Sequence, residues 1–316
     1  LNLGSFEALT FTELFDGAKS IPWEDVIGRD DEFPVSGHSI KSKLFSVPDC
    51  QRIIKKAVSV RLGEKYGLER LPETGKRYRI EFFLFKDKVS MMIDLSGIPL
   101  HKRGYRPETV EAPIRETLAA AMVKISRPRE DVLLWDPFCG SGTIAIEAAM
   151  QMRNIAPGIN RSFSAEEYPI FPIESWKTAR EKAKAAIKTD SKFEAYATDI
   201  DPKCVEIASA AAKRAGVDDM LNIFTMDALD IDTLGRRGTI VTNPPYGDRL
   251  LTVDEANDLY RAMGQAFSRL DRWQIYVITQ SEEFPKLYGR RADKIRKLYN
   301  GMIPCYYYQF FKQQNK

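Results

Sequence analysis

After about residue 108 the sequence alternates regularly between short apolar runs and longer segments with apolar residues at helical spacing. The runs predict strands at 132–135, 195–198, 221–225, 239–242 and 274–279, and the spaced segments predict helices at 112–125, 143–152, 203–215 and 256–270. Strand–helix alternation indicates a doubly wound α/β fold with a mostly parallel sheet. The aromatic segment Tyr299–Phe311 predicts a late strand in an antiparallel edge.

The first hundred residues predict a smaller α+β unit. Residues 49–66 have apolar side chains at helical spacing, with Asp49 as the expected N-cap and Gly67 as the expected stop. The segment Arg79–Ile93 has β-rich residues on both sides of a turn at 86–88, which predicts two strands. A domain boundary is therefore expected shortly after residue 95.

Charge is distributed unevenly along the chain. Residues 41–106 carry sixteen basic and seven acidic side chains, whereas residues 1–40 carry two basic and eight acidic ones. A basic segment suits nucleic acid, because neutralised phosphates release counterions, although a solvated basic face fits the charge equally well. The candidate phosphate contacts are Lys41, Lys43, Lys55, Lys56, Lys102, Arg103 and Arg106. A second basic cluster is either a similar surface or a plain surface helix, and comprises Lys286, Arg290, Arg291, Lys294, Arg296 and Lys297.

Cysteine and histidine usage excludes several classes of chemistry. The four cysteines are far apart and there are only two histidines, which argues against a metal site, a disulfide framework and a histidine-based triad. No apolar run reaches the roughly 18 residues of a membrane span. Residues 1–18 lack the pattern of a signal peptide. We therefore expect a cytoplasmic protein without metal or membrane partner.

The segment VLLWDPFCGSGT (132–143) predicts a strand, a tight glycine turn and the start of a helix. Gly140 and Gly142 permit positive φ and close approach of a ligand to the backbone. The loop is neither a phosphate-binding Walker loop nor a GxGxxG dinucleotide motif. Asp136 instead places an anion beside the turn, which suits a ligand with a cationic amine or sulfonium. The alternative is a turn that needs its glycines for geometry alone.

Acidic residues follow the next two predicted strands. Asp199 can accept the two hydroxyl groups of a ribose, as acidic residues do in dinucleotide folds. Asp201 is better explained as the N-cap of the next helix, because Pro202 follows it at the first helical position. Asp227 can accept from an adenine amino group while the amide of Ala228 donates to the ring. Alone, such an Asp is more often a plain loop carboxylate, and the functional interpretation of Asp227 depends on its place as the third motif in the expected order.

The strand at 239–242 runs into Asn243-Pro244-Pro245-Tyr246. The prolines fix φ and lack amide donors, so the loop is stiff and rich in acceptors. The Asn243 side chain and the Pro244 carbonyl can accept both hydrogens of an NH₂ group, which stabilises the positive charge that grows as the nitrogen attacks a methyl group. Tyr246 offers a flat face to a flipped base. The alternative is a rigid turn that only ends the strand.

These motifs carry a family resemblance. DPFCGSGT, ATDID, MDA and TNPPYG, in that order, resemble the cofactor and catalytic motifs of class I amino-methyltransferases. LHKRGYR (100–106), VEAPIRETLAAAM (110–122) and NIAPG (154–158) resemble segments of bacterial large-subunit rRNA guanine-N2 methyltransferases that carry a THUMP domain. The resemblance covers residues 40–316. Members of that family are often labelled N6-adenine-specific DNA methylases, because the NPPY motif is shared.

The resemblance implies a Rossmann-like class I methyltransferase domain at 113–316 that uses S-adenosyl-L-methionine (SAM). It also implies a THUMP RNA-binding domain at 1–98, which normally begins further upstream than Leu1, and a linker at 99–112 that includes the start of the cofactor-binding segment. By carry-over, Asn243, Pro244, Pro245 and Tyr246 form the catalytic loop. The implied cofactor-binding residues are Ala112, Pro113, Asp136, Phe138, Gly140, Gly142, Asp199, Ile200, Asp227 and Ala228.

The predicted function is SAM-dependent methylation of a guanine N2 amine in RNA, with 23S ribosomal RNA favoured. Three alternatives stay open: a tRNA guanine-N2 methyltransferase, a DNA adenine-N6 methyltransferase, and a catalytically silent RNA-binding protein. The intact segment 243–246 argues against the last of these. The sequence gives no indication of the target nucleotide or of the oligomeric state.

Overall fold

The computed structural model describes residues 1–106, 114–233, 235–246 and 252–311. The chain forms two compact units, Leu1–Pro99 with Ser162–Thr178, and Leu100–Arg161 with Ala179–Lys316. The sequence placed Ser162–Thr178 in the second domain, and the structure differs there. Tyr168 stacks on Tyr78 with ring centroids 4.2 Å apart, and its hydroxyl donates to the carbonyl oxygens of Arg77 and Asp94. These contacts attach the segment to the first unit.

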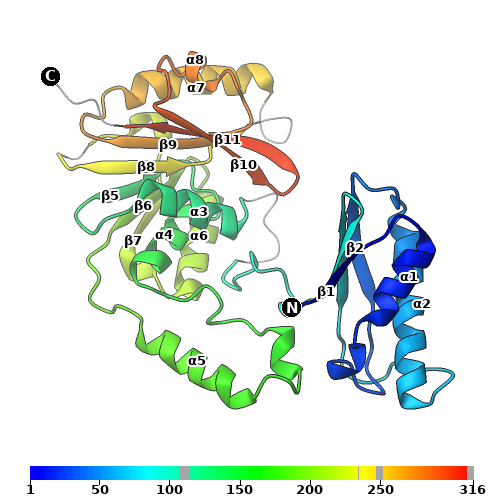
Figure 1. Cartoon of the computed structure of the whole chain (residues 1–316). Coiled ribbons are helices and arrows are strands. Elements are labelled where there is room, and N and C mark those ends of the chain that lie inside the picture. The colour runs from blue at the N-terminus through cyan, green and yellow to red at the C-terminus, as the bar shows by residue number, and fades with distance from the viewer. Residues whose placement is uncertain (107–113, 234, 247–251, 312–316) are drawn as a thin grey trace. The chain divides into compact units, whose positions relative to one another are not determined.

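The first unit combines a four-stranded sheet of order β1-β4-β3-β2 with two helices (Figure 1). The strands are β1 (Asn2–Glu7), β2 (Val35–Ile40), β3 (Ile80–Phe85) and β4 (Lys88–Ile93). The helices are α1 (Phe11–Ser20) and α2 (Val47–Tyr66), with a short 3₁₀ helix at Trp23–Asp25. Buried residues of α1, α2 and the sheet form one continuous core.

Two predictions for this unit are confirmed and one is wrong. The β3–β4 hairpin pairs antiparallel, and α2 ends at Gly67 in the left-handed conformation, with φ at 65°. The N-cap of α2 is Ser46 rather than Asp49. The helix starts earlier because Pro48 lies in its first turn, where a missing amide hydrogen costs nothing.

The second unit contains a seven-stranded sheet of order β10-β11-β9-β8-β5-β6-β7 (Figure 1). The parallel strands are β5 (Leu133–Asp136), β6 (Ala195–Asp199), β7 (Leu221–Thr225), β8 (Gly238–Thr242) and β9 (Gln274–Thr279). The strands β10 (Lys294–Asn300) and β11 (Ile303–Phe310) pair antiparallel at one edge. The predicted doubly wound sheet with an antiparallel edge is confirmed. The basic cluster near residue 294 lies partly in β10, so its interpretation as a plain surface helix is wrong.

Helices cover both faces of this sheet (Figure 1). Residues of α3, α4 and α6 form a core with one face, and residues of α7 and α8 form a core with the other. The helices are α3 (Glu116–Ser126), α4 (Thr143–Met152), α6 (Pro202–Ala215), α7 (Val253–Phe267) and α8 (Phe284–Leu287). Residues Ile173–Ala185 form α5, and 3₁₀ helices span Ser164–Glu167, Asp218–Met220 and Ala228–Asp230. Within the described part of the chain, no helix combines the length and apolarity of a membrane span.

Candidate active site

The candidate site is built at the carboxyl end of β5, which pairs with β6 on one side and β8 on the other. Ligands of open α/β sheets bind at such a switch point, because the loops on either side diverge. Asp136 ends β5 and is 1% exposed. Burial raises the pKa of its carboxyl group to about 7, against hydrogen bonds donated by the Thr242 hydroxyl (2.7 Å) and the Phe138 amide (3.3 Å). No basic side chain of the described residues pairs with it, so a cationic ligand group would relieve this cost.

The two glycines of the loop have different structural roles. Gly140 has φ at 51°, and a Cβ atom there would meet no heavy atom within 4 Å. Gly142 has φ at 76°, and its Cβ would lie 3.0 Å from the Cβ of Ala208 in α6. Gly142 therefore lets α4 begin close to α6, whereas Gly140 borders open space.

Asp199 is fixed at the end of β6 by the neighbouring loops. Its Oδ2 accepts from the amide of Gly140 at 2.9 Å, and its Oδ1 accepts from the amide of Asp201 at 3.0 Å. Each carboxylate oxygen keeps acceptor capacity for a ribose hydroxyl. Ile200 beside it is 69% exposed, an apolar surface of the kind that an adenine ring would cover. Asp201 is the N-cap of α6, as predicted, and accepts from the amide of Lys203.

Asp227 lies at the end of the adjacent strand, β7. Its Oδ1 accepts from the amide of Leu229 at 2.9 Å and caps the short 3₁₀ helix that begins with Ala228. The amide of Met226 donates to the carbonyl oxygen of Asp199, which ties the two strand ends together. Asp227 is thus positioned by a local turn, one strand away from Asp199.

The Asn243 loop leaves β8 directly beside Asp136. The bond from the Thr242 hydroxyl to Asp136 fixes the residue that precedes Asn243. The Oδ1 atom of Asn243 is buried and has no hydrogen-bond partner among the described residues. A buried acceptor without a hydrogen bond lowers the stability of a protein by about 1–3 kcal/mol, so its presence here calls for an explanation. A ligand amine that donates to this oxygen would supply one. Pro244 next to it is buried, and Pro245 is half-buried.

Tyr246 is half-buried, and its hydroxyl lies 3.9 Å from the Sγ of Cys305 in β11. Burial raises the pKa of this phenol, and the neighbouring thiol adds to the rise. The ring also packs against the core on the α7 side of the sheet. Cys305 was not predicted, because a single cysteine in a tyrosine-rich strand gives no functional signal.

Three further cofactor-binding residues were predicted from the sequence. Phe138 is half-buried in the glycine loop, whereas Ala112 and Pro113 lie outside the described residues. No group of three metal-ligating side chains occurs among the residues that the structure describes.

Three of the predicted phosphate contacts form ion pairs within the protein. Arg103 pairs with Glu147 at 3.1 Å, and the two side chains are only 10% and 2% exposed. Arg106 pairs with the buried Glu116 at 2.7 Å. Lys55 donates to Glu73 and lies over the Phe33 ring. These ion pairs give the three cations a role in local structure. The remaining candidates are exposed: Lys41, Lys43, Lys56 and Lys102.

The sheet order, the glycine loop, the carboxylates at successive strand ends and the Asn-Pro-Pro-Tyr loop together define a class of protein. They are the features of a Rossmann-like class I methyltransferase that takes SAM as cofactor. The buried Asp136 carboxyl group and the open space at Gly140 fit that cofactor.

Comparison with known proteins identifies the family. Residues 103–309 match the family described as RMKL-like, methyltransferase domain, and residues 8–94 match the THUMP domain. The chain belongs to this RMKL-like methyltransferase family. The domain content also confirms the predicted THUMP unit in front of the methyltransferase unit.

Individual relatives agree with this assignment. The chain is 44% identical to "Putative RNA methyltransferase YpsC" of Bacillus subtilis (strain 168), over 99% of this chain and 82% of that protein. It is 35% identical to the ribosomal RNA large subunit methyltransferase K/L of Psychromonas ingrahamii, over 96% of this chain but 42% of that protein. The structure superposes on that of "SMU.472, a putative methyltransferase complexed with SAH" with a TM-score of 0.91, at 40% identity, covering 100% of this chain and 84% of that one.

Proposed function

We propose that this protein transfers a methyl group from SAM to the exocyclic N2 amine of a guanine in RNA, and specifically in 23S ribosomal RNA. The observation that carries the proposal is the buried Oδ1 of Asn243, which has no hydrogen-bond partner in the described part of the chain and lies one residue beyond the Thr242–Asp136 contact. RNA as substrate is supported by the THUMP domain and by the names of the relatives, YpsC and methyltransferase K/L.

The chain's own residues would hold the cofactor along three strand ends. Asp136 would face the cationic amino acid part, with Phe138 beside it and with Gly140 and Gly142 shaping the loop. Asp199 would accept the ribose hydroxyls, and Ile200 would cover the adenine. The edge of the adenine would meet Asp227 and the amide of Ala228.

When bound, SAM supplies a methyl group whose bond to sulfur breaks as its bond to the attacking nitrogen forms. The guanine amine is a poor nucleophile because its lone pair is delocalised into the ring. Asn243 Oδ1 and the Pro244 carbonyl would accept its two hydrogens, rotate the lone pair toward the methyl group and stabilise the positive charge that develops. One of these protons then leaves to water, so the site needs no strong base.

The loop would also exclude water and orient the base. Pro244 and Pro245 fix the backbone that presents the two acceptors. Tyr246 is held at its hydroxyl end near Cys305 and would offer its ring to the flipped base, which offsets part of the unstacking cost.

Phosphate contacts in the first unit would come from its exposed lysines, Lys41, Lys43 and Lys56, and Lys102 would add a contact from the second unit. Phe45 is 81% exposed in the same loop as Lys41 and Lys43, and it was not predicted as a functional residue. An exposed aromatic ring beside lysines can stack on an unpaired base. This combination favours RNA with single-stranded segments as the ligand.

The acceptor pair would fit any purine amine, so the product must be identified chemically. Purified protein with labelled SAM would be offered rRNA, tRNA and duplex DNA, each from a strain with the gene and a strain without it. The expected result is label only in rRNA from the deletion strain, recovered as N2-methylguanosine. Label in tRNA would change the RNA assigned, and label as N6-methyladenine in DNA would overturn the substrate. No transfer to any of the three would favour a silent RNA-binding protein.

A further inference from the structure

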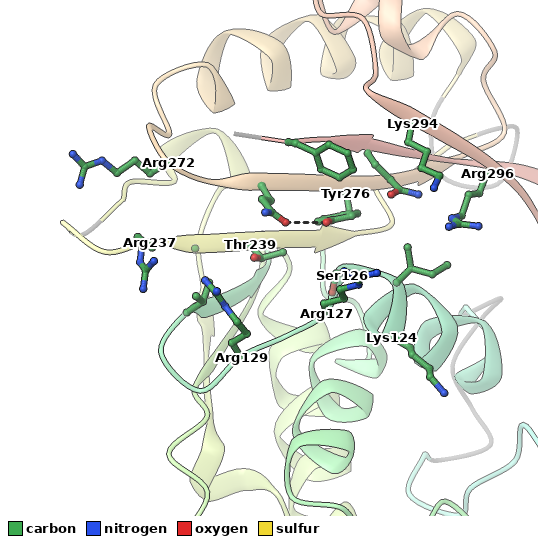
Figure 2. A pocket seen from close by; sticks show the side chains of 16 residues that line it. Lys124, Ser126, Arg127, Arg129, Arg237, Thr239, Arg272, Tyr276, Lys294 and Arg296 are labelled. Atoms are coloured by element: carbon green, nitrogen blue, oxygen red, sulfur yellow. Dashed lines mark hydrogen bonds between the residues drawn. The ribbon is translucent and has the colours of Figure 1, made fainter. Parts of the chain in front are cut away.

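A second cavity of the methyltransferase unit lies at the opposite ends of the strands from the candidate site (Figure 2). It has a volume of about 660 Å³ and lies between the end of α3 and the amino ends of β8 and β9. With a rise of about 3.3 Å per residue, Gly238 at the cavity is about 13 Å from Thr242 at the other end of β8. The cavity is therefore separate from the cofactor site.

The charge of the cavity is one-sided. Seven basic residues and no acidic residue line it, namely Lys124, Arg127, Arg129, Arg237, Arg272, Lys294 and Arg296. Nearby carboxylates occupy three of them, since Asp131 pairs with Arg129 and Arg237, and Asp271 pairs with Arg272.

Four cations remain without a carboxylate within ion-pair distance among the described residues: Lys124, Arg127, Lys294 and Arg296. In Figure 2, Lys294 and Arg296 extend from their strand toward the helix end that carries Ser126 and Arg127. Like charges held together in this way repel each other unless an anion lies between them.

A buried donor in the same cavity strengthens the case. Gln309 is 3% exposed, and its Nε2 has no hydrogen-bond partner among the described residues. It lies in β11 opposite Tyr276 of β9 and Lys294 of β10. The hydroxyl of Tyr276 is already directed at Gln274. The cavity thus presents an unused N–H donor as well as free positive charge, a combination that suits an oxyanion.

A purely structural role explains only part of this arrangement. Cations near a helix C-terminus interact favourably with the carbonyl groups there, which accounts for Lys124 and Arg127 at the end of α3. Lys294, Arg296 and Gln309 belong to the β10–β11 hairpin, and the helix end gives no reason for an unpaired buried amide among them.

We propose that this cavity binds phosphate groups of the RNA substrate, at a distance from the base that receives the methyl group. The volume suits one or two nucleotides, since ligand pockets range over about 300–1,000 Å³. Guanidinium groups match phosphate oxygens geometrically, and Ile125, Tyr276 and Phe311 add apolar surface for a sugar or base. The inference rests on the proposed function in taking RNA as the substrate. Free nucleotides carry the same phosphate chemistry and are separated by the test.

The test compares two faces of one strand. Lys294→Gln combined with Arg296→Gln removes two charges from the cavity. Lys297→Gln removes one charge from the same strand, on the opposite face. Affinity for rRNA fragments would be measured over a series of salt concentrations. The slope of log Kd against log salt falls by about one for each phosphate-binding cation removed, so it should fall by about two in the double variant and stay unchanged in Lys297→Gln.

Further measurements separate an effect on RNA binding from damage to the fold or to the cofactor site. SAM affinity should stay unchanged in both variants, because the cavity is remote from Asp136. Gln309→Glu should weaken RNA binding more strongly than the double variant does, because it places a carboxylate in the cavity. Equal slopes in all variants, with methylation intact, would overturn this inference alone. Tight binding of ATP or inorganic pyrophosphate that is abolished in the double variant, without a change in the RNA slope, would overturn RNA as the phosphate source. An unaltered protein that neither binds nor methylates RNA would overturn the proposed function as well.

Discussion

Replacement of Asp136 by Asn changes the charge at the centre of the site while keeping its shape. Asp136 is 1% exposed, and burial raises its pKa from 3.8 to about 7 in spite of the hydrogen bond from Thr242. The folded protein therefore holds a proton over a pH range in which the unfolded chain releases it. It follows that this group's contribution to stability is present below about pH 4 and is lost as the pH rises to about 7.

The size of the effect follows from the difference in pKa. At about 1.4 kcal/mol per pKa unit, a rise from 3.8 to about 7 corresponds to at most about 4 kcal/mol. The asparagine side chain of the variant cannot ionise, and its Oδ1 still accepts from the Thr242 hydroxyl. We expect Asp136→Asn to match the unaltered protein at about pH 4 and to exceed its free energy of unfolding by up to about 4 kcal/mol at about pH 8. SAM should bind the variant more weakly, because the proposed role of Asp136 is to face the cationic amino acid part of the cofactor.

Urea unfolding at a series of pH values measures this directly, with tryptophan fluorescence as the signal, since Trp135 precedes Asp136 in β5. Asp201→Asn is a suitable control, because Asp201 is an exposed N-cap and Asn caps equally well. The control should keep the pH dependence of the unaltered protein. The reasoning is refuted if Asp136→Asn keeps that dependence, or if it lowers the stability at pH 8.

Two further predictions concern residues whose roles the structure separates. Arg103→Ala should destabilise the protein by about 3–5 kcal/mol in urea unfolding, because it leaves the buried carboxylate of Glu147 without its partner. Lys102→Ala should change the free energy of unfolding by less than about 0.5 kcal/mol, because Lys102 is exposed. Similar losses of stability in the Arg103 and Lys102 variants would contradict the importance of the buried ion pair. Gly140→Ala should fold, at a cost of about 1 kcal/mol for its positive φ, and should weaken SAM binding in calorimetry. Gly142→Ala should lose more stability than Gly140→Ala, because its Cβ would meet α6. Equal losses of stability in the two variants would contradict the different structural roles given to the two glycines.

The centre of the methyltransferase sheet was predictable because β5, β8 and β9 are buried on both faces. Such strands read as apolar runs between turn residues, as in β5 before Asp136 and β8 before Asn243. The site followed from the same pattern, because functional residues come at the ends of those runs. The first two strands gave no such signal, since β1 and β2 are only half-buried and contain glycine and serine. Helix α5 was not predicted, because it fully buries no side chain and therefore needs no apolar stripe in its sequence.

The basic residues were predicted least well, because charge does not reveal its partner. Arg103 and Glu147 are far apart in the sequence, and only the fold brings them together. In the later cluster a plain surface helix was one of two interpretations, although Lys294 and Arg296 alternate with a period of two, which is the spacing of a strand. That alternation places both cations on the face that lines the second cavity.

The buried oxygen of Asn243 is the feature on which the proposed chemistry depends most. Single-turnover methyl transfer to rRNA from the deletion strain, measured for Asn243→Ala together with SAM affinity by calorimetry, tests its role directly. We predict that the rate falls by about 10²–10³-fold, the usual cost of one preorganised group that stabilises transition-state charge, while SAM binds as before. A rate near that of the unaltered protein, or a loss of SAM binding in place of a loss of rate, would contradict the role assigned to Asn243.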